Sequence, residues 1–230
     1  MALNILLTGA SRGIGAACVT ALQSGKTRLF AASSRDADLG RPDGASQLWD
    51  MALDALGGRV DILINNAGIF EATPLNGSDA DWLAGWQRTM TVNLEASAVL
   101  CRKAVLHWQD RTSGGRIVNI ASRAAYRGDS PAHWHYAASK AGMVAMTKTI
   151  ARAYAAENIY AFAVCPGFTM TGMAEEYLSS RGGDTLLADI PLGKVAAPEE
   201  IAAIVKFLVE NAPPSMTGAV LDANGASYVR

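Results

Sequence analysis

The chain has 230 residues, of which 50% are apolar, and a net charge of −1 at pH 7. The near-neutral charge without a basic cluster argues against nucleic-acid binding, and no apolar run approaches the ~20 residues that span a bilayer. The N-terminus shows no signal-peptide pattern, and Cys18, Cys101 and Cys165 lie far apart in apolar surroundings, as expected for reduced, buried thiols of a cytoplasmic protein.

Strands and helices are predicted to alternate along the chain, without a linker or an internal repeat. Apolar, β-branched runs predict strands near 3–8, 28–33, 60–65, 115–121, 159–165 and 218–222. Helices are predicted near 13–24, 45–56, 79–111, 135–156 and 198–210. This alternation indicates an α/β fold, a Rossmann-like, doubly wound parallel sheet in three layers, as a single domain over 1–230. Ligands of such sheets bind at the carboxyl ends of the strands.

A glycine-rich turn follows the first predicted strand and opens a helix, in LNILLTGASRGIG. Gly9, Gly13 and Gly15 have the spacing GxxxGxG. Glycines permit a tight turn and a close approach of backbone to pyrophosphate, and the helix N-terminus supplies amide donors. The pattern alone would also fit a structural turn, but its place between a strand and a helix favours a dinucleotide site.

The end of the second predicted strand, RLFAASSRD, decides which dinucleotide is used. A carboxylate there accepts the ribose hydroxyls of NAD and repels a 2′-phosphate. Ser34 and Arg35, together with Arg12 of the glycine turn, favour NADP(H) instead. Asp36 keeps NAD(H) open, because a register shifted by one or two residues would place its carboxylate at that position.

Tyr136 and Lys140 lie four residues apart in YAASK, on one face of the helix predicted at 135–156. An ammonium at ~4 Å, with an effective dielectric of ~20, favours phenolate by about 4 kcal/mol, or roughly three pKa units. The spacing therefore predicts a tyrosine with a pKa near ~7, suited to general acid–base catalysis. Taken alone, the same spacing also fits a solvated helix face.

Six ordered motifs together resemble those of the short-chain dehydrogenase/reductase family along nearly the whole chain. They are TGxxxGIG at 8–15, NNAG at 65–68, the helix asparagine Asn93, Ser122 at the end of GRIVNIAS, YxxxK at 136–140, and PGxxxT at 166–171. The resemblance implies an oxidoreductase that passes hydride between a nicotinamide cofactor, NADP(H) in preference to NAD(H), and a small carbonyl or alcohol substrate. It implies no metal.

The resemblance also assigns roles to single residues. Tyr136 would exchange a proton with the substrate oxygen, and Ser122 would donate a hydrogen bond to it. Lys140 would tune the tyrosine and bind the nicotinamide ribose, while Asn93 would hold a water in a proton relay. The cofactor-binding residues implied are Gly9, Ser11, Arg12, Gly13, Ile14, Gly15, Ser34, Arg35, Asp38, Leu39, Asn66, Ala67, Gly68, Tyr136, Lys140, Pro166, Gly167, Thr169 and Thr171.

Residues 36–59 depart from the family pattern, because they are too few for the helix, third strand and second helix usually found there. The second helix is retained at 45–56, so the helix before the third strand is predicted to be missing. Asp38 and Leu39 are expected beside the adenine, on a vestigial strand, with a solvated loop as the alternative. Residues 172–190 are expected to form a mobile helical lid.

Several side chains around the expected pocket have two interpretations. His133 and His135 have no third metal ligand, and are expected either to line the substrate mouth or to be structural. Arg123, Arg127 and Arg181 leave phosphorylated or carboxylated substrates open, but they also fit solvated surface arginines.

The leading functional hypothesis is an NADP-dependent carbonyl reductase or alcohol dehydrogenase. A 3-oxoacyl-thioester (acyl carrier protein) reductase is the alternative, because the segment PLGKVAAPEE is similar to the one found in such reductases. Glu157 argues against it, because such reductases tend to carry a basic residue at that position, where it meets the acidic carrier protein. A non-catalytic dinucleotide-binding regulator is the third hypothesis, and it usually lacks the tyrosine or the lysine.

A homotetramer is the expected assembly. Two apolar stripes on long helices suggest more apolar surface than one sheet face needs, and the resemblance implies two-fold contacts there and at the C-terminal tail. The stripes are Val99, Leu100, Ala104, Val105 and Trp108, and Met143, Met146, Ile150 and Tyr154.

Overall fold

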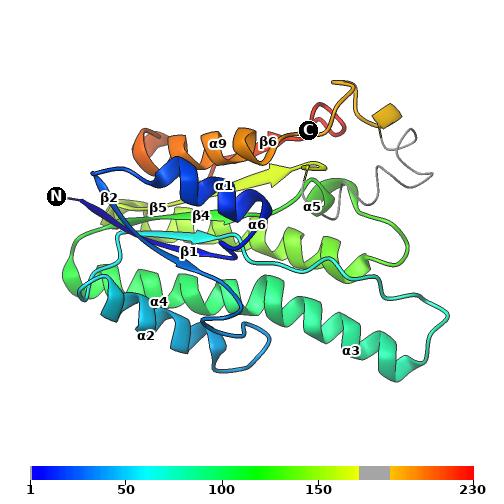
Figure 1. Cartoon of the computed structure of the whole chain (residues 1–230), viewed down its shortest axis with the longest axis horizontal. Coiled ribbons are helices and arrows are strands. Elements are labelled where there is room, and N and C mark those ends of the chain that lie inside the picture. Colours follow the sequence, from blue (N-terminus) through cyan, green and yellow to red (C-terminus); the bar gives the residue numbers. More distant parts are fainter. Residues whose placement is uncertain (1, 171–186) are drawn as a thin grey trace.

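The computed structural model describes residues 2–170 and 187–230 (Figure 1). In this part of the chain one parallel sheet forms, with the order β2-β1-β3-β4-β5-β6. The strands are β1 (Leu3–Thr8), β2 (Thr27–Ala32), β3 (Ile62–Asn65), β4 (Gly115–Ile120), β5 (Ile159–Pro166) and β6 (Val220–Ala223). Each coincides closely with a strand predicted from the sequence.

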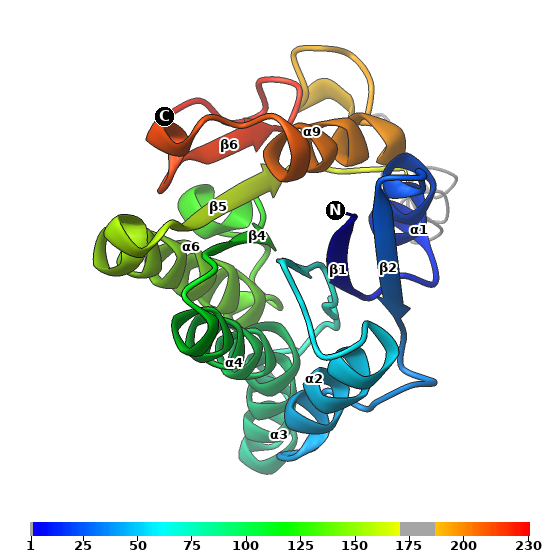
Figure 2. The same cartoon turned by 90° about the vertical axis from the view of Figure 1, so that its left-hand side faces the viewer.

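Helices cover both faces of the sheet. The α-helices of the described chain are α1 (Gly13–Leu22), α2 (Gly44–Ala55), α3 (Asp79–Met90), α4 (Ala96–Arg111), α5 (Ala124–Arg127), α6 (Trp134–Tyr154) and α9 (Pro198–Glu210). Figures 1 and 2 show α1 and α9 on one face and α2, α4 and α6 on the other. This arrangement confirms the three-layer, doubly wound α/β fold. None of the described helices is both long and apolar enough to cross a membrane.

The strands read as continuous apolar runs because both faces of the sheet are buried. Alternate residues of β1 point to opposite sides: Ile5 and Leu7 pack in the cluster under α1 and α9, whereas Leu6 packs in the cluster under α2 and α4. The three cysteines are buried and free, as predicted. The rigid sheet fixes the ends of its strands, where the candidate site lies.

The strand order places the topological switch point between β1 and β3. The chain leaves β1 for β2 on one side, then crosses back to add β3 on the other side of β1. A crevice opens at the carboxyl ends of the two strands at such a point. Gly9 follows β1 there, and Asn66 follows β3.

The segment that links β2 to α2 differs from the prediction. Residues 33–43 form turns, without a helix and without a strand, so β2 is the edge of the sheet. The sequence predicted the loss of the helix and a vestigial third strand, with a solvated loop as the alternative; the helix is indeed absent from this segment, and the segment is a loop rather than a strand. Asp38 closes the loop, because its Oδ1 accepts a hydrogen bond from the Gly40 N–H at 2.8 Å. Leu39 packs against the core beneath.

The long helix predicted at 79–111 contains a π-helical turn. This turn, η1 (Thr91–Glu95), separates α3 from α4 and carries Asn93, which is completely buried. A π turn adds one residue to a helical turn and rotates the side chains that follow, and such turns are frequent at functional sites. The apolar periodicity continues across it, so the sequence predicted one uninterrupted helix.

Candidate active site

The turn after β1 is a cradle that only glycine fits. Gly9 has φ +69°, and a Cβ built on it would lie 2.7 Å from the Cα of Ala67. A Cβ on Gly15 would collide with the carbonyl group of Gly9. Gly13 follows at φ +54° and begins α1, whose first amide groups point to the turn. The shape and the unpaired amides fit a bound pyrophosphate.

The NNAG motif after β3 holds this turn in place. The Nδ2 of Asn66 donates to the carbonyl oxygens of Thr8 and Gly9, at 3.0 and 2.9 Å. The Thr8 Oγ1 in turn accepts from the backbone N–H groups of Asn66 and Ala67. The two motifs, far apart in the sequence, therefore form one hydrogen-bonded unit at the switch point.

Tyr136 and Lys140 are brought together in the first turns of α6. The Lys140 Nζ donates to the carbonyl oxygen of Ile120, at the end of β4, at 2.8 Å. It also lies 5.8 Å from the centre of the Tyr136 ring. Lys140 is only 4% exposed, so its ammonium is enclosed by the site rather than by solvent. The alternative of a solvated helix face is therefore wrong for this pair.

The electrostatics of the pair differ from the prediction of a tyrosine pKa near ~7. Burial raises the pKa of Tyr136 to about 12, with a hydrogen bond to Ser122 acting in the opposite direction. Burial also lowers the pKa of Lys140 to about 8. Desolvation is the largest cause of both shifts, because Lys140 is buried and Tyr136 is partly buried, and the simple charge-pair argument left this effect out.

Ser122 and Asn93 are the other two residues predicted to be catalytic. Ser122 follows β4 directly and is buried, and its Oγ accepts the N–H of Ala124 at 3.1 Å. The Asn93 Nδ2 donates to the Ile69 carbonyl oxygen at 3.0 Å and to the Ser139 Oγ at 3.3 Å. Ser139 donates to the Tyr136 carbonyl oxygen, so Asn93 is linked to the helix that carries the tyrosine.

Phe70 is a site residue that the sequence reasoning missed. Its ring lies edge-on to Tyr136, with centres 4.8 Å apart, and stacks flat on His133 at 3.9 Å. Its position two residues after NNAG was the available signal. His133 therefore lies next to the candidate site, separated from Tyr136 by the Phe70 ring. His135 is structural, because its Nε2 lies 3.1 Å from the Thr73 Oγ1 and from the Glu71 carbonyl oxygen.

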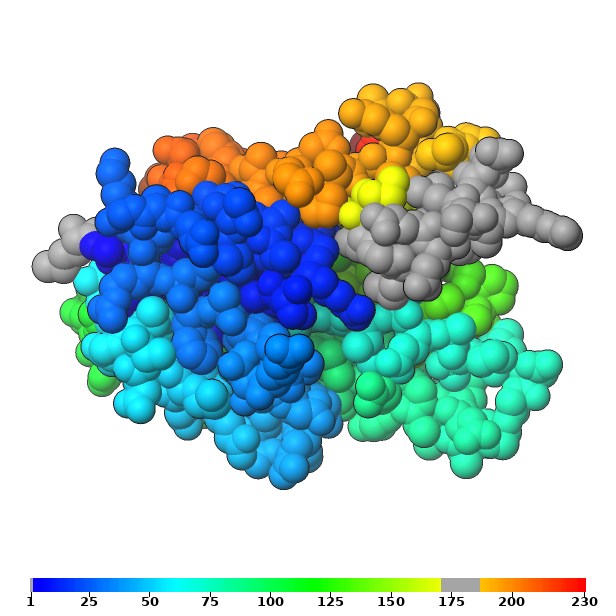
Figure 3. All heavy atoms as spheres, in the orientation of Figure 1, coloured from blue at the N-terminus to red at the C-terminus, as the bar shows by residue number. Residues whose placement is uncertain are grey.

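The residues predicted to select the dinucleotide are Arg12, in the glycine turn, and Ser34 and Arg35, after β2. In Figure 3 the N-terminal residues, in shades of blue, form one continuous surface on this face. Ser34, Arg35 and Arg12 are exposed, and in the described chain neither guanidinium has an ion-pair partner. The Asp36 carboxylate is turned back, with Oδ2 accepting from the Ser33 N–H at 2.7 Å and from the Ser33 hydroxyl at 2.9 Å.

The PGxxxT motif follows β5. A Cβ on Gly167 would lie 2.8 Å from the Cα of Asn224, so the ends of β5 and β6 approach closely here. Thr169 is buried, and its Oγ1 donates to the Gly167 carbonyl oxygen. Thr171, Arg181 and most of the expected lid lie outside the described residues. Among the described residues, no group of three or more His, Cys, Asp or Glu side chains could hold a metal.

The chain resembles known reductases and dehydrogenases along nearly its full length. A family model described as "Enoyl-(Acyl carrier protein) reductase" matches residues 25–225. A 3-oxoacyl-[acyl-carrier-protein] reductase of Synechocystis sp. is 34% identical over 96% of this chain and 94% of its own. A 3beta-hydroxysteroid dehydrogenase 1 of Eggerthella lenta is 32% identical over 96% of this chain and 92% of its own.

A solved structure gives the same result. It is described as a candidate 2-deoxy-d-gluconate 3-dehydrogenase from Agrobacterium tumefaciens with bound NADP. Its TM-score is 0.86 at 28% identity, covering 99% of this chain and 97% of that one. The chain therefore belongs to the short-chain dehydrogenase/reductase family, and it is an NAD(P)-dependent oxidoreductase that acts on a carbonyl or alcohol group.

Proposed function

We propose that the protein is an NADP(H)-dependent carbonyl reductase or alcohol dehydrogenase with Tyr136 as its general acid–base. The observation that carries this proposal is the buried Lys140 ammonium, held on the Ile120 carbonyl oxygen beside the tyrosine ring. Both side chains lie at the carboxyl edge of the sheet, on the same side as the glycine cradle. A proton-transfer pair and a dinucleotide cradle at one edge suit hydride-transfer chemistry.

The protein residues supply the proton and the polarisation of the substrate. NADPH, when bound at the glycine cradle, would supply the hydride for the carbonyl carbon. Ser122 donates a hydrogen bond to the carbonyl oxygen, and Tyr136 then gives it a proton. Because burial raises the pKa of Tyr136 to about 12, the phenol carries its proton at neutral pH and is ready to act as an acid. The reverse oxidation needs the phenolate, so its rate rises with pH.

The proton on Tyr136 must be replaced after each turnover. Lys140 is placed to do this, since burial lowers its pKa to about 8, closer to neutral pH than that of an exposed lysine. We assign to Asn93 the water that passes protons from solvent to Lys140. In support, a Cβ added to Gly68 would lie 3.3 Å from the Asn93 Oδ1 and 3.5 Å from the Lys140 Nζ, so both groups border the same glycine.

NADP(H) is the proposed cofactor. Arg12 and Arg35 offer a 2′-phosphate two exposed guanidinium groups that have no ion-pair partner among residues 2–170 and 187–230, and Ser34 adds a hydroxyl. The carboxylate that would suit NAD(H), Asp36, already accepts two hydrogen bonds from Ser33. Asp38 and Leu39 are proposed to border the adenine, and residues 172–190 to cover the substrate.

A 3-oxoacyl-thioester reductase is the second candidate, because relatives such as the Synechocystis protein carry that name. Glu157 weighs against it: it is exposed and accepts a hydrogen bond from Gln109 at 2.9 Å, which leaves an acidic group where an acidic carrier would need a basic one. A non-catalytic regulator is not supported, since tyrosine, lysine, serine and asparagine are all in place.

The proposal is tested with a panel of ketones, aldehydes and acyl thioesters, offered with NADPH and with NADH. We expect loss of reduced-nicotinamide absorbance with a simple carbonyl compound and NADPH. Faster turnover of an acyl thioester than of every free ketone and aldehyde would favour the second candidate. No turnover of any member with either cofactor would contradict both.

A homotetramer in the cytoplasm is proposed from the family resemblance and the free cysteines. The apolar stripes give the tetramer no support, because their side chains pack within one chain. The buried members are Leu100, Ala104, Val105, Trp108, Met143 and Ile150. The partly buried members, which pack against the core, are Val99, Met146 and Tyr154. Light scattering should give four times the chain mass of 24.1 kDa. A mass of one chain would refute the assembly.

A further inference from the structure

The residue after the catalytic serine is a buried arginine. Arg123 is only 8% exposed, although the sequence also allowed a solvated surface position. Its backbone N–H donates to the Pro166 carbonyl oxygen at 2.9 Å, so it is fixed between the ends of β4 and β5. Burying a guanidinium is costly unless its N–H groups are well paired. The position next to Ser122 therefore raises the question of what pairs with this charge.

The described chain pairs Arg123 poorly. One Asp189 oxygen, Oδ2, accepts from the Arg123 Nη1 at 3.4 Å and from the Arg127 Nη1 at 2.6 Å. The short contact belongs to Arg127, so the Asp189 carboxylate, whose side chain is 46% exposed, serves mainly that residue. Arg123 has no other hydrogen-bond acceptor for its side chain within the described residues, although a guanidinium carries five N–H donors.

The surroundings of the Arg123 head belong to the active site. Its guanidinium lies over the Phe168 ring, 5.0 Å from the centre, and Phe168 follows the PG motif after β5. Burial lowers the pKa of Arg123, and Asp129 is among the groups that oppose this. Burial is also the main cause of the raised Tyr136 pKa, to which Asp129 adds. Arg123 and Tyr136 thus lie within electrostatic range of the same carboxylate.

We propose that Arg123 binds an anionic group of the substrate, so that the protein acts on an oxo acid or a hydroxy acid. The inference rests on the proposed carbonyl–alcohol chemistry and narrows its substrate class. A carboxylate supplies two oxygens in the plane that the guanidinium fork matches, and it completes the pairing that Asp189 leaves unfinished. A phosphate group offers similar oxygens, and the test includes it. The acyl part of a simple 3-oxoacyl thioester carries no such group, so it would leave Arg123 with its weak contact to Asp189 alone among the described residues.

The contrary interpretation is that Arg123 only ties the strand ends to Asp189. The Asp189→Asn variant separates the two. If Arg123 binds substrate, loss of the competing carboxylate frees its N–H donors, and kcat/KM for an acid rises. If the ion pair only supports the loops, the same variant lowers activity toward acids and neutral substrates alike.

The experiment compares pyruvate, acetoacetate and levulinate with their methyl esters, and adds dihydroxyacetone phosphate against dihydroxyacetone, all with NADPH. We expect kcat/KM for at least one anion to exceed that of its neutral partner about tenfold or more. Arg123→Met should lower that value by about 10- to 150-fold, the range for one charge-assisted hydrogen bond, and leave the neutral partner within about threefold. Which pair responds shows whether carboxylate or phosphate is bound.

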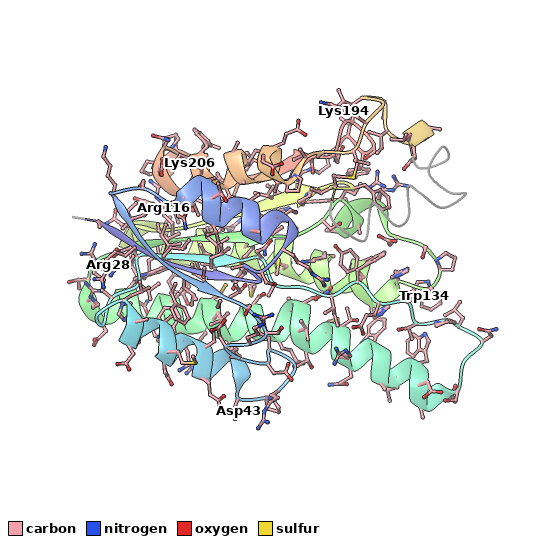
Figure 4. All side chains as sticks on the ribbon, viewed as in Figure 1. Arg28, Asp43, Arg116, Trp134, Lys194 and Lys206 are labelled. Carbon is pink, nitrogen blue, oxygen red and sulfur yellow. The ribbon has the colours of Figure 1, made fainter. Side chains whose placement is uncertain are left out.

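Two further variants keep the test decisive. Arg116→Met is the control, because it removes the same charge at the other end of β4 (Figure 4). Arg116 donates there to the carbonyl oxygens of Leu208 and Ala212. This variant should not change the ratio of kcat/KM for the anion to kcat/KM for its neutral partner. Arg123→Lys retains the charge without the planar fork, and it replaces Arg123→Met in the test if that variant does not fold. Its ratio of kcat/KM for the anion to kcat/KM for the neutral partner should be lower than that of the unmodified protein.

Three results would overturn the proposal: no preference for any anion in the unmodified protein, equal losses for both partners in Arg123→Met, or a loss for both in Asp189→Asn. If no carbonyl compound is turned over, the proposed function fails. The binding of the same acids to the protein, in the presence of NADP⁺, is then measured by calorimetry and tests this inference separately. Acid binding that Arg123→Met weakens tenfold or more would support it, and no binding to the unmodified protein would contradict it.

Discussion

Replacing Tyr136 with Phe should lower kcat for carbonyl reduction by at least ~10²-fold, since a positioned general acid contributes about 10²- to 10⁴-fold. The change removes one hydroxyl group and keeps the ring that packs edge-on against Phe70. Affinity for NADPH should stay nearly unchanged, because the cradle around Gly9 and Asn66 is not touched. Steady-state kinetics and a direct titration with NADPH give the two values.

The matched control for this variant is Tyr160→Phe. Tyr160 lies in β5, near the amino end of the strand, and its hydroxyl donates to the Asn158 Oδ1 at 3.0 Å, remote from the catalytic set. The control should retain the turnover of the unmodified protein. Full turnover in Tyr136→Phe would remove the assigned mechanism, and a tenfold weaker NADPH affinity would show that the hydroxyl serves cofactor binding instead.

A second large effect is expected at the adenosine end. The double variant Ser34→Asp and Arg35→Ala should reverse the proposed preference for NADPH to a preference for NADH. Loss of one charge-assisted contact to the 2′-phosphate, worth ~1.5–3 kcal/mol, should lower kcat/KM for NADPH by about 10- to 150-fold, and the new carboxylate should repel the phosphate further. The same carboxylate should accept the ribose hydroxyls of NADH.

Arg28→Ala, which removes one positive charge, controls for the loss of the Arg35 charge. Arg28 lies near the amino end of β2, whereas Ser34 and Arg35 follow the carboxyl end of that strand, and Figure 4 shows Arg28 far along the molecule from Trp134 at the start of α6. Its ratio of kcat/KM values should match that of the unmodified protein. A preference for NADH before any substitution would contradict the cofactor assignment at once.

Most of the fold could be predicted because the information is local. The strand at Leu3–Thr8 is an apolar run that ends at a glycine, and a sheet buried on both faces requires such runs. The conformation of residues 33–43 could not be predicted, since it depends on the distance between the end of β2 and the start of α2, which this short segment must bridge. A count of residues indicated that the helix was lost, but it left open whether a vestigial third strand or a loop remained.

The candidate site could be predicted in its identities more than in its energetics. Spacing alone placed Tyr136 and Lys140 on one helix face, and the glycine motif marked the cradle. The tyrosine pKa was wrong because burial is a tertiary property that no spacing shows. For the same reason the sequence did not reveal the π turn at Asn93, the packing of Phe70 on the tyrosine, or the burial of Arg123.

The most direct test of the account is to follow the hydrogen itself. NADPH that carries deuterium at the transferable position of nicotinamide C4 is mixed with the enzyme and the best carbonyl substrate, and the alcohol is examined by mass spectrometry and NMR. The account predicts one deuterium on the carbon that bore the carbonyl oxygen, at a rate that falls with Tyr136→Phe. An alcohol without deuterium, or NADPH oxidised without any alcohol formed, would contradict it.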